Sequence, residues 1–216
     1  TGTWEFARDL EFQNTLQTGT FTTDATKDFT VKIDVQNLDP HTYYYYRFKS
    51  GNRYSLVGRT KTAPAEGVQH MRIGVVSCVN FQAGFFNGYR NLARRNDMDL
   101  IVNLGDYLYE YAEGGYGYSD SLGRGHEPDH EMVSLEDYRL RYSFYHLDPD
   151  LMRAHQLYPF VTVWDDHEST NDSYKDGAEN HQADEGDWEV RKNSSAQAYH
   201  EWLPSRTPDQ NNPLPV

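Results

Sequence analysis

The stretch Asp99–Glu110, DLIVNLGDYLYE, joins an apolar run to a Gly-Asp turn and a tyrosine. The run contains β-branched residues and does not alternate with polar ones, which is typical of a strand covered on both faces. Two further runs share this pattern, RIGVVS at Arg72–Ser77 and FVTVW at Phe160–Trp164. Because a helical pattern over Phe85–Arg95 separates the first two runs, the sequence predicts a βαβ unit in a parallel sheet. The predicted fold class of this part of the chain is α/β.

Side chains that can bind metals follow each of the three runs. Cys78 follows the first run, Asp106 and Tyr109 follow the second, and Asp166 and His167 follow the third. In an open α/β sheet, reactive groups gather outside the carboxyl ends of the strands. A phenolate ligand requires a strong Lewis acid, because an unperturbed tyrosine titrates near pH ~10, and a thiolate favours a transition metal over a hard cation. The sequence therefore predicts a metal site that suits Fe(III) better than Mg or Ca.

Each of these signals also has an ordinary explanation. Cys78 could be a small core residue, the Gly-Asp pair a simple turn, and Tyr109 a packing residue. Residues Asp165–His167 could begin a helix, with a carboxylate as the cap. We favour the metal site because the signals coincide at three successive strand ends.

The N-terminal part of the chain shows a different β pattern. Residues 19–62 are typical of a β-meander, and alternation over Phe29–Val35 predicts a strand with one solvated face. A tyrosine-rich strand over Thr42–Phe48 and another over Val57–Lys61 follow. Tyrosines at such a corner occur in immunoglobulin-like sandwiches, although packing within the sheet is the interpretation that we favour over an aromatic binding stripe. Residues 1–16 give no clear structural start.

Local signals place the remaining helices. Ser134 and Asp137 form a capping pattern for a helix that runs to about Tyr145. We expect a short helix over Leu151–His155 after the Asp-Pro break, and a last helix over Asp187–Trp202.

The composition excludes several classes of protein. A net charge of −13 argues against a nucleic-acid-binding surface. A single cysteine excludes an internal disulfide framework, and no stretch approaches the length and apolarity of a membrane span.

The motifs resemble those of a known superfamily. The element GDYLYE at Gly105–Glu110 resembles the GD-x-x-Y element of the metallophosphatases, which include the purple acid phosphatases. The pair Ser77-Cys78, the element WDDHE at Trp164–Glu168 and the pair Asn171-Asp172 resemble, more narrowly, the PhoD-like alkaline phosphatases, a family that includes secreted phospholipase D enzymes. The resemblance implies a metallophosphatase-type α/β sheet domain preceded by a small immunoglobulin- or fibronectin type III-like β-sandwich. We therefore expect a sandwich-like domain with its linker over residues 1–66, and the N-terminal part of the catalytic domain over residues 67–216.

The same resemblance implies residue roles and an activity. Cys78 and Tyr109 would bind Fe(III), and Asp106 would bridge Fe(III) to Ca(II). Asp166 would be a further metal ligand, His167 would stabilise the transition state or protonate the leaving oxygen, and Asn171 would contact calcium or phosphate. The expected activity is hydrolysis of phosphate monoesters or diesters, including phospholipids, by a metal-activated water.

The resemblance also implies what lies outside these motifs. Members of the family carry further histidine and carboxylate ligands in a later part of the sheet, and nothing after Val190 shows a strand followed by such a motif. We expect residues 1–216 to hold about half of a site, and the remaining C-terminal part of the catalytic domain to complete it. A secreted or cell-surface location is implied, although the chain shows no signal peptide. The alternative is a secreted calcium-binding module without catalysis.

Overall fold

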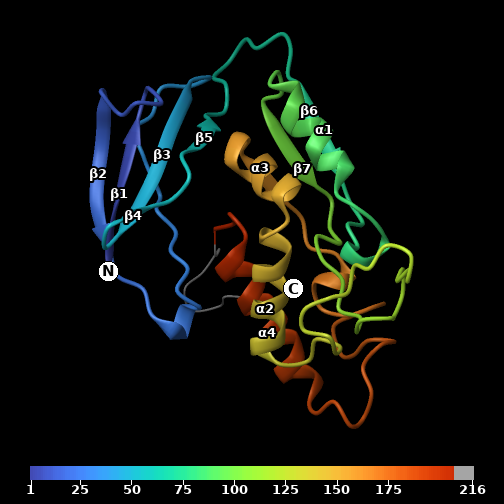
Figure 1. Ribbon diagram of the computed structural model, residues 1–216. Coiled ribbons are helices and arrows are strands. Elements are labelled where there is room, and N and C mark those ends of the chain that lie inside the picture. The colour runs from blue at the N-terminus through green and yellow to red at the C-terminus, as the bar shows by residue number, and fades with distance from the viewer. Residues whose placement is uncertain (207–216) are drawn as a thin grey trace.

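The computed structural model describes residues 1–206 and contains two β-sheets with helices between and beside them (Figure 1). The first sheet has five antiparallel strands: β1 (Gly2–Ala7), β2 (Thr15–Phe21), β3 (Tyr43–Ser50), β4 (Arg53–Tyr54) and β5 (Gly58–Lys61). The second sheet has three parallel strands: β6 (Ile73–Val76), β7 (Leu100–Asn103) and β8 (Phe160–Thr162). The predicted α/β fold of the later part of the chain is therefore present, with β7 in the centre of its sheet.

Each of the four predicted helices is present, with starts that agree with the prediction to within two residues. Their bounds are α1 (Asn87–Arg95), α2 (Leu135–His146), α3 (Pro149–Leu157) and α4 (Trp188–Trp202), with short 3-10 turns η1 (Ala25–Lys27), η2 (Phe81–Ala83) and η3 (Asp166–Glu168). Ser134 and Asp137 form the predicted capping box at the start of α2. Asp148 caps α3, whose first residue is Pro149, so this helix is longer at both ends than the predicted segment. No helix within residues 1–206 is long and apolar enough to cross a membrane.

The first sheet packs on its own tyrosines. Tyr44 is fully buried, stacks on Phe6 with ring centroids 5.0 Å apart, and accepts a hydrogen bond at 2.9 Å from the backbone N–H of Asp39. These contacts show packing within the sheet at Tyr44, as expected for this strand.

Two expectations for the N-terminal part were wrong. Residues 29–35 are not a strand, because Phe29 adopts a left-handed backbone (φ 55°) directly after η1 and the segment that follows forms no ladder. Residues 1–16 have a clear structural start, since β1 lies between β2 and β3. Among residues 1–206 the N-terminal strands form one sheet rather than two stacked sheets, so the immunoglobulin-like sandwich stays a prediction.

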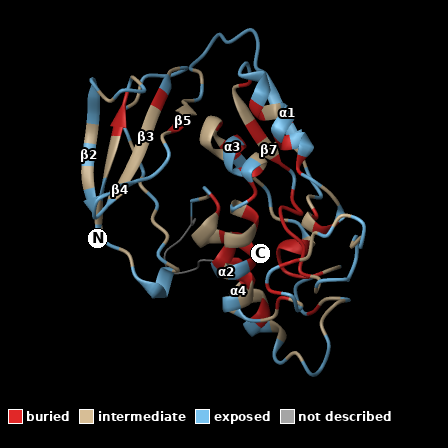
Figure 2. Ribbon diagram, viewed as in Figure 1, coloured by how far each residue is buried: buried red, intermediate tan, exposed pale blue. Residues whose placement is uncertain are grey.

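One face of the parallel sheet is covered and the other is open. The covered face includes Ile101 and Phe160 and packs against helices α1 to α4 in a tyrosine-rich core: Tyr89, Tyr107, Tyr138, Tyr142, Tyr145, Leu151, Ala154 and Tyr199. Figure 2 shows these buried residues gathered in the helices and in the loops beside them. On the opposite face Ile73, Val75 and Val161 are 47%, 59% and 52% exposed.

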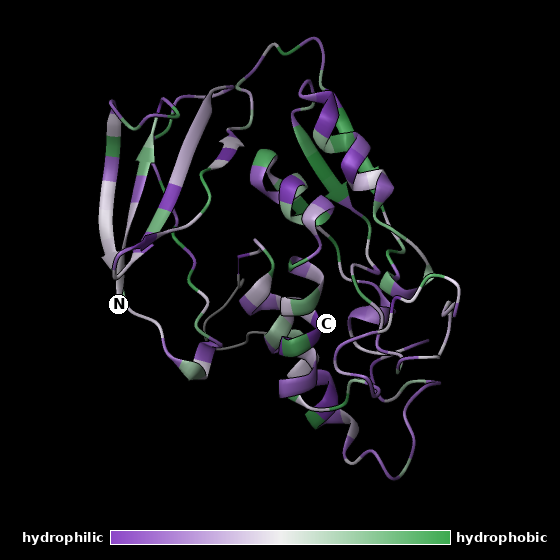
Figure 3. Cartoon of the chain, in the orientation of Figure 1, coloured by the Kyte–Doolittle hydropathy of each residue, from purple (hydrophilic) through white to green (hydrophobic). Residues whose placement is uncertain are grey.

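The expectation that these strands are covered on both faces was therefore wrong for the described part of the chain. Figure 3 places the strands beside α1 at the hydrophobic end of the scale, as the sequence pattern requires. The helices within residues 1–206 supply a cover for only one face, and the aliphatic residues of the other face meet solvent.

Direct contacts join the first sheet to the α/β part. Lys61 forms an ion pair with Asp99, next to the start of β7. On α3, which lies between the two sheets in Figure 1, Gln156 donates to the carbonyl of Val57 at 2.8 Å and the carbonyl of Leu157 accepts from Arg59 at 3.1 Å. The two sheets are therefore joined by these contacts as well as by the chain between β5 and β6.

Candidate metal centre

The turn after β7 brings Asp106 to the end of the sheet. Gly105 has φ 103°, and a Cβ at this position would lie 2.3 Å from the Cβ of Asp165, so only glycine fits. Asp106 itself has a left-handed backbone (φ 51°), as does Cys78 (φ 58°) after β6. The backbone N–H groups of Cys78 and Val79 donate to the carbonyls of Gly105 (3.3 Å) and Asp106 (2.9 Å). The turns after β6 and β7 are therefore fastened to each other.

The turn after β8 carries Asp166 and His167. Asp165 caps η3 and its backbone N–H donates to Glu168 at 2.9 Å, so the helix-start explanation of this sequence is also correct. The buried carboxylate of Glu168 accepts two further N–H groups across the sheet end, from Asp106 (3.2 Å) and Tyr107 (2.7 Å). Burial raises the pKa of Glu168 to about 8, against the opposing effect of these hydrogen bonds. Glu168 thus ties the turn after β8 to the turn after β7.

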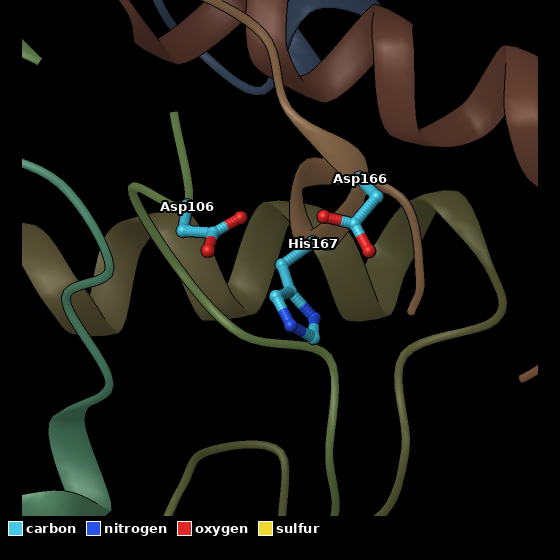
Figure 4. A group of neighbouring side chains, drawn as sticks. All are labelled: Asp106, Asp166 and His167. Atoms are coloured by element: carbon cyan, nitrogen blue, oxygen red, sulfur yellow. The ribbon is translucent and has the colours of Figure 1, made fainter. Parts of the chain in front are cut away.

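Three candidate ligands converge at this point. Asp106, Asp166 and His167 each offer one ligand atom, and these atoms lie within 4.8 Å of one another. Figure 4 shows Asp106 approaching from one turn and the other two side chains from the neighbouring turn. One oxygen of Asp106, Oδ2, accepts a hydrogen bond from the phenol of Tyr109 at 3.1 Å. The other oxygen, Oδ1, is buried and has no hydrogen-bond partner among the described residues.

His167 is held by a second buried carboxylate. Its Nδ1 lies 2.7 Å from Oε2 of Glu110, and its ring centroid lies 4.1 Å from that of Tyr109. Burial alone would lower the pKa of His167, but the hydrogen bond and charge of Glu110, with the charges of Asp106 and Asp166, raise it. Burial opposes ionisation of Glu110 as well, yet the contact with His167 lowers the pKa of the Glu110 carboxyl.

Tyr109 is close to the cluster but remains a phenol in the absence of a cation. Burial raises its pKa above the ordinary value of 10, and the neighbouring side chains of Asp106 and Cys78 raise it further. Cys78 is exposed and lies outside the group formed by Asp106, Asp166 and His167. The structure therefore places the thiol near Tyr109 at the rim, not within the tightest cluster.

Asn171 is held by two glutamates beside the cluster. Its backbone N–H donates to Oε1 of Glu110 at 2.8 Å, and its side-chain amide donates to Glu179 at 3.0 Å. A direct contact of Asn171 with metal or phosphate stays a prediction.

Sequence reasoning missed two acidic residues of the site. Glu110 and Glu168 lie inside the elements GDYLYE and WDDHE, and both side chains are fully buried. A buried carboxylate needs several donors. The only sequence signal for them is an acidic residue beside a run of aromatic or apolar ones.

Two buried arginines hold the long loops that flank the cluster, residues 104–134 between β7 and α2 and residues 169–187 between η3 and α4. Arg141 is fully buried and donates to backbone carbonyls of the loop between β7 and α2: Tyr109, Tyr111, Glu127, Pro128 and His130. Arg191 donates to the carbonyl of Asn180 and to the carboxylates of Glu185 and Glu131. A hollow of about 300 Å³ beside Asp166 is lined by Trp164, Asp165, Ser169, Ser173, Tyr174, Lys175, Trp188 and Lys192. The hydrogen bonds of Arg141 and Arg191 thus fasten both loops to helices α2 and α4.

The donor set fits a bound cation. Asp106 and Asp166 bring two carboxylates into close contact, which is unfavourable without a positive charge between them. The buried, unpartnered Oδ1 of Asp106 supplies a free ligand atom, and a cation is what would ionise the phenol of Tyr109.

Comparison with known proteins agrees with this geometry. The PhoD-like phosphatase family matches residues 73–215, and the PhoD-like phosphatase N-terminal domain matches residues 1–64. Alkaline phosphatase D of Bacillus subtilis (strain 168) is 36% identical over 205 residues, which cover 94% of this chain and 35% of the relative. A solved structure described as "Structure of PhoD" superposes with a TM-score of 0.87 at 35% identity, over 95% of this chain and 39% of that one. The chain spans little more than a third of the length of these relatives. The chain belongs to the PhoD-like phosphatase family.

Proposed function

We propose that this chain forms part of a metal-dependent phosphate ester hydrolase. The observation that carries the proposal is the convergence of Asp106, Asp166 and His167 at the ends of β7 and β8, with one Asp106 oxygen buried and unpartnered. Membership of a phosphatase family supports the reaction class.

The ligand assignment follows the donor types. Tyr109 and Cys78 are the donors suited to Fe(III), and Asp106 has one oxygen toward Tyr109 and one left for a second cation. Asp166 would hold Ca(II) together with Asp106, and Asn171 is a weaker candidate for calcium or phosphate. When bound, these cations would supply positive charge for the phosphate oxygens and lower the pKa of a coordinated water.

His167 is the candidate for proton transfer. Its Nδ1 is engaged by Glu110, so Nε2 is the atom available to the substrate side of the cluster. From there it would stabilise charge on the phosphate or deliver a proton to the leaving oxygen. The hollow beside Asp166 offers space for a small organic group of the ester.

We further propose that additional chain is needed for activity. The open face of the parallel sheet is aliphatic, as in strands that are covered on both sides, and a remaining C-terminal part of the catalytic domain would cover it. The same segment would bring the further ligands. Secretion or a cell-surface location is proposed from the family resemblance alone.

The test is an assay of a full-length protein that contains this chain, on a phosphomonoester and on a phosphatidylcholine-type diester, with and without a chelator. We expect hydrolysis of at least one substrate and its loss on chelation. Activity that survives removal of all metal contradicts the proposal, and absence of activity with calcium as the only bound metal favours a non-catalytic calcium-binding module.

Variants assign the ligands. Tyr109→Phe should abolish any charge-transfer colour from Fe(III), and Asp106→Asn should lower the content of both metals. His167→Ala should slow turnover and keep the metals; an empty site in this variant would make His167 a ligand. Asp120→Asn, at an exposed aspartate outside the cluster, is the matched control and should change neither metal content nor rate.

A further inference from the structure

We infer that Glu110 is a positioning residue that keeps the shared proton on Nδ1 of His167, so that Nε2 is bare in the neutral ring and carries the transferable proton in the charged ring. The inference concerns the chemistry of one ring nitrogen. It rests on the proposed function only where activity is measured.

The hydrogen bonds of Glu110 carry the inference. Its side chain is fully buried, and Oε2 lies 2.7 Å from Nδ1 of His167. Three donors surround Oε1: the backbone N–H of Asn171 (2.8 Å), Asn180 Nδ2 (3.0 Å) and Thr170 Oγ1 (3.2 Å), whose one hydrogen is shared with the carbonyl of Asn180 (2.8 Å). An ionised carboxylate can only accept, so the proton between Glu110 and His167 belongs to Nδ1. A neutral imidazole with its proton on Nδ1 must have an unprotonated Nε2.

The residues around His167 hold its imidazole ring in this orientation. His167 is 8% exposed and lies against the rings of Tyr109 and Tyr111, with centroids 4.1 and 5.6 Å away. Within residues 1–206 Nε2 has no hydrogen-bond partner, so the bond to Glu110 is the contact that sets the ring's orientation. Turning the ring over would place a carbon against the buried carboxylate and leave Oε2 without a donor.

The two oxygens of Glu110 have separable tasks. Oε1 anchors the segment from Thr170 to Asn180, whereas Oε2 contacts His167 alone. In Glu110→Gln the three donors around Oε1 require the amide oxygen to occupy that position. The amide NH₂ must then face His167, and a donor there forces Nδ1 to become the acceptor. The substitution keeps the shape and the loop anchor, yet moves the imidazole proton to Nε2.

The first measurement reads the tautomer directly. Histidine ¹⁵N spectra of the full-length, metal-free protein are recorded while the pH is raised until His167 is neutral, and the signal is assigned by its loss in His167→Asn. We expect a protonated Nδ1 in the parent protein and a protonated Nε2 in Glu110→Gln. The same tautomer in both proteins overturns the inference, and this result does not depend on any activity.

The second measurement uses the metal-loaded enzyme. Partners that orient a metal-site histidine typically contribute about 10- to 100-fold in metal affinity or activity, and because His167 is assigned to proton transfer, Glu110→Gln should lose that much in kcat. Thr170→Val is the matched control, because it removes the hydroxyl that bonds the Asn180 carbonyl and approaches Oε1, and leaves the contact of Glu110 with His167 intact. It should keep the parental tautomer and most of the activity.

The outcomes separate the two proposals. Equal losses in Glu110→Gln and Thr170→Val mean that Glu110 only supports the loop, which overturns the inference. A reversed tautomer in a full-length protein that hydrolyses no phosphate ester supports the inference and defeats the proposed function.

Discussion

The two faces of the parallel sheet carry similar aliphatic residues but lie in opposite surroundings. On the covered face, Ile101 and Phe160 are 0% and 7% exposed beneath helices. On the other face, Ile73, Val75 and Val161 have about half of their surface in solvent. Contiguous exposed aliphatic surface on a folded protein usually marks a contact with something else. The difference supports the proposal that these strands are covered by a neighbour outside residues 1–206.

The largest expected effect comes from a cavity on the covered face. Ile101→Ala should lower the free energy of unfolding by about 2–5 kcal/mol, because the surrounding tyrosine-rich core cannot collapse fully into the space. Val161→Ala, on the open face of the neighbouring strand, should lower it by less than about 1 kcal/mol. Denaturant unfolding of both variants checks the pair. Similar losses from the two variants would mean that the faces do not differ as described.

Acid should destabilise the fold through two histidines that pack on the covered face. Tyr107 lies between two half-buried histidines, with its hydroxyl 2.9 Å from Nε2 of His146 and 2.8 Å from Nε2 of His155, and the ring of His155 stacks on Phe160. Burial lowers the pKa of His146 to about 4, and burial with the charge of His146 lowers that of His155. The unfolded chain therefore takes up these protons first as the pH falls.

The sign of this effect is fixed by the direction of the pKa shifts. The contribution of these histidines to stability is complete above about pH 6.5 and declines as the pH falls toward 4. The loss should be on the order of 3 kcal/mol for His146 alone. Unfolding midpoints measured against pH should show a shallower acid limb in His155→Gln and an unchanged limb in His70→Gln, at an exposed position. An acid limb that His155→Gln leaves unaltered would contradict the assignment.

The smallest effect is expected from a substitution on the open face of the sheet, measured in two lengths of the protein. Val75→Thr keeps the β-branched shape and should change the unfolding free energy of residues 1–216 by less than about 0.5 kcal/mol, because the new hydroxyl meets water. In a longer protein whose following chain covers this face, the same hydroxyl would be buried without a partner and should cost about 1–3 kcal/mol. Calorimetry of both lengths measures the difference. Equal effects in the two would indicate that the following chain leaves this face open.

Local sequence signals predicted much of the fold. Ser134 starts α2 as predicted, because capping is decided within a few residues, whereas Asp148, interpreted only as part of a break, also caps α3. The strand-end rule likewise brought Asp106 together with Asp166 and His167, since all three follow strands of one sheet. The strand predicted over residues 29–35 is absent, because alternation of apolar and polar residues does not reveal the left-handed backbone at Phe29.

The supporting carboxylates of the site could not be predicted in the same way. The partners of Glu168 include backbone N–H groups of Asp106 and Tyr107, about sixty positions earlier in the chain. Glu110 likewise reaches His167 and Asn180 across a comparable separation. No spacing rule connects residues so far apart. Their partners become visible only once the turns after β7 and β8 lie side by side.

The bonds of Glu168 also have a consequence for how this segment can change during evolution. Because one carboxylate holds backbone groups of both turns, a residue inserted between Gly105 and Glu110, or between Asp165 and Glu168, would shift a donor out of reach. The exposed stretch from Ala65 to His70 has no hydrogen bond to Glu168 and can absorb changes in length. Related sequences should therefore vary in length at that stretch and keep constant spacing within the two turns.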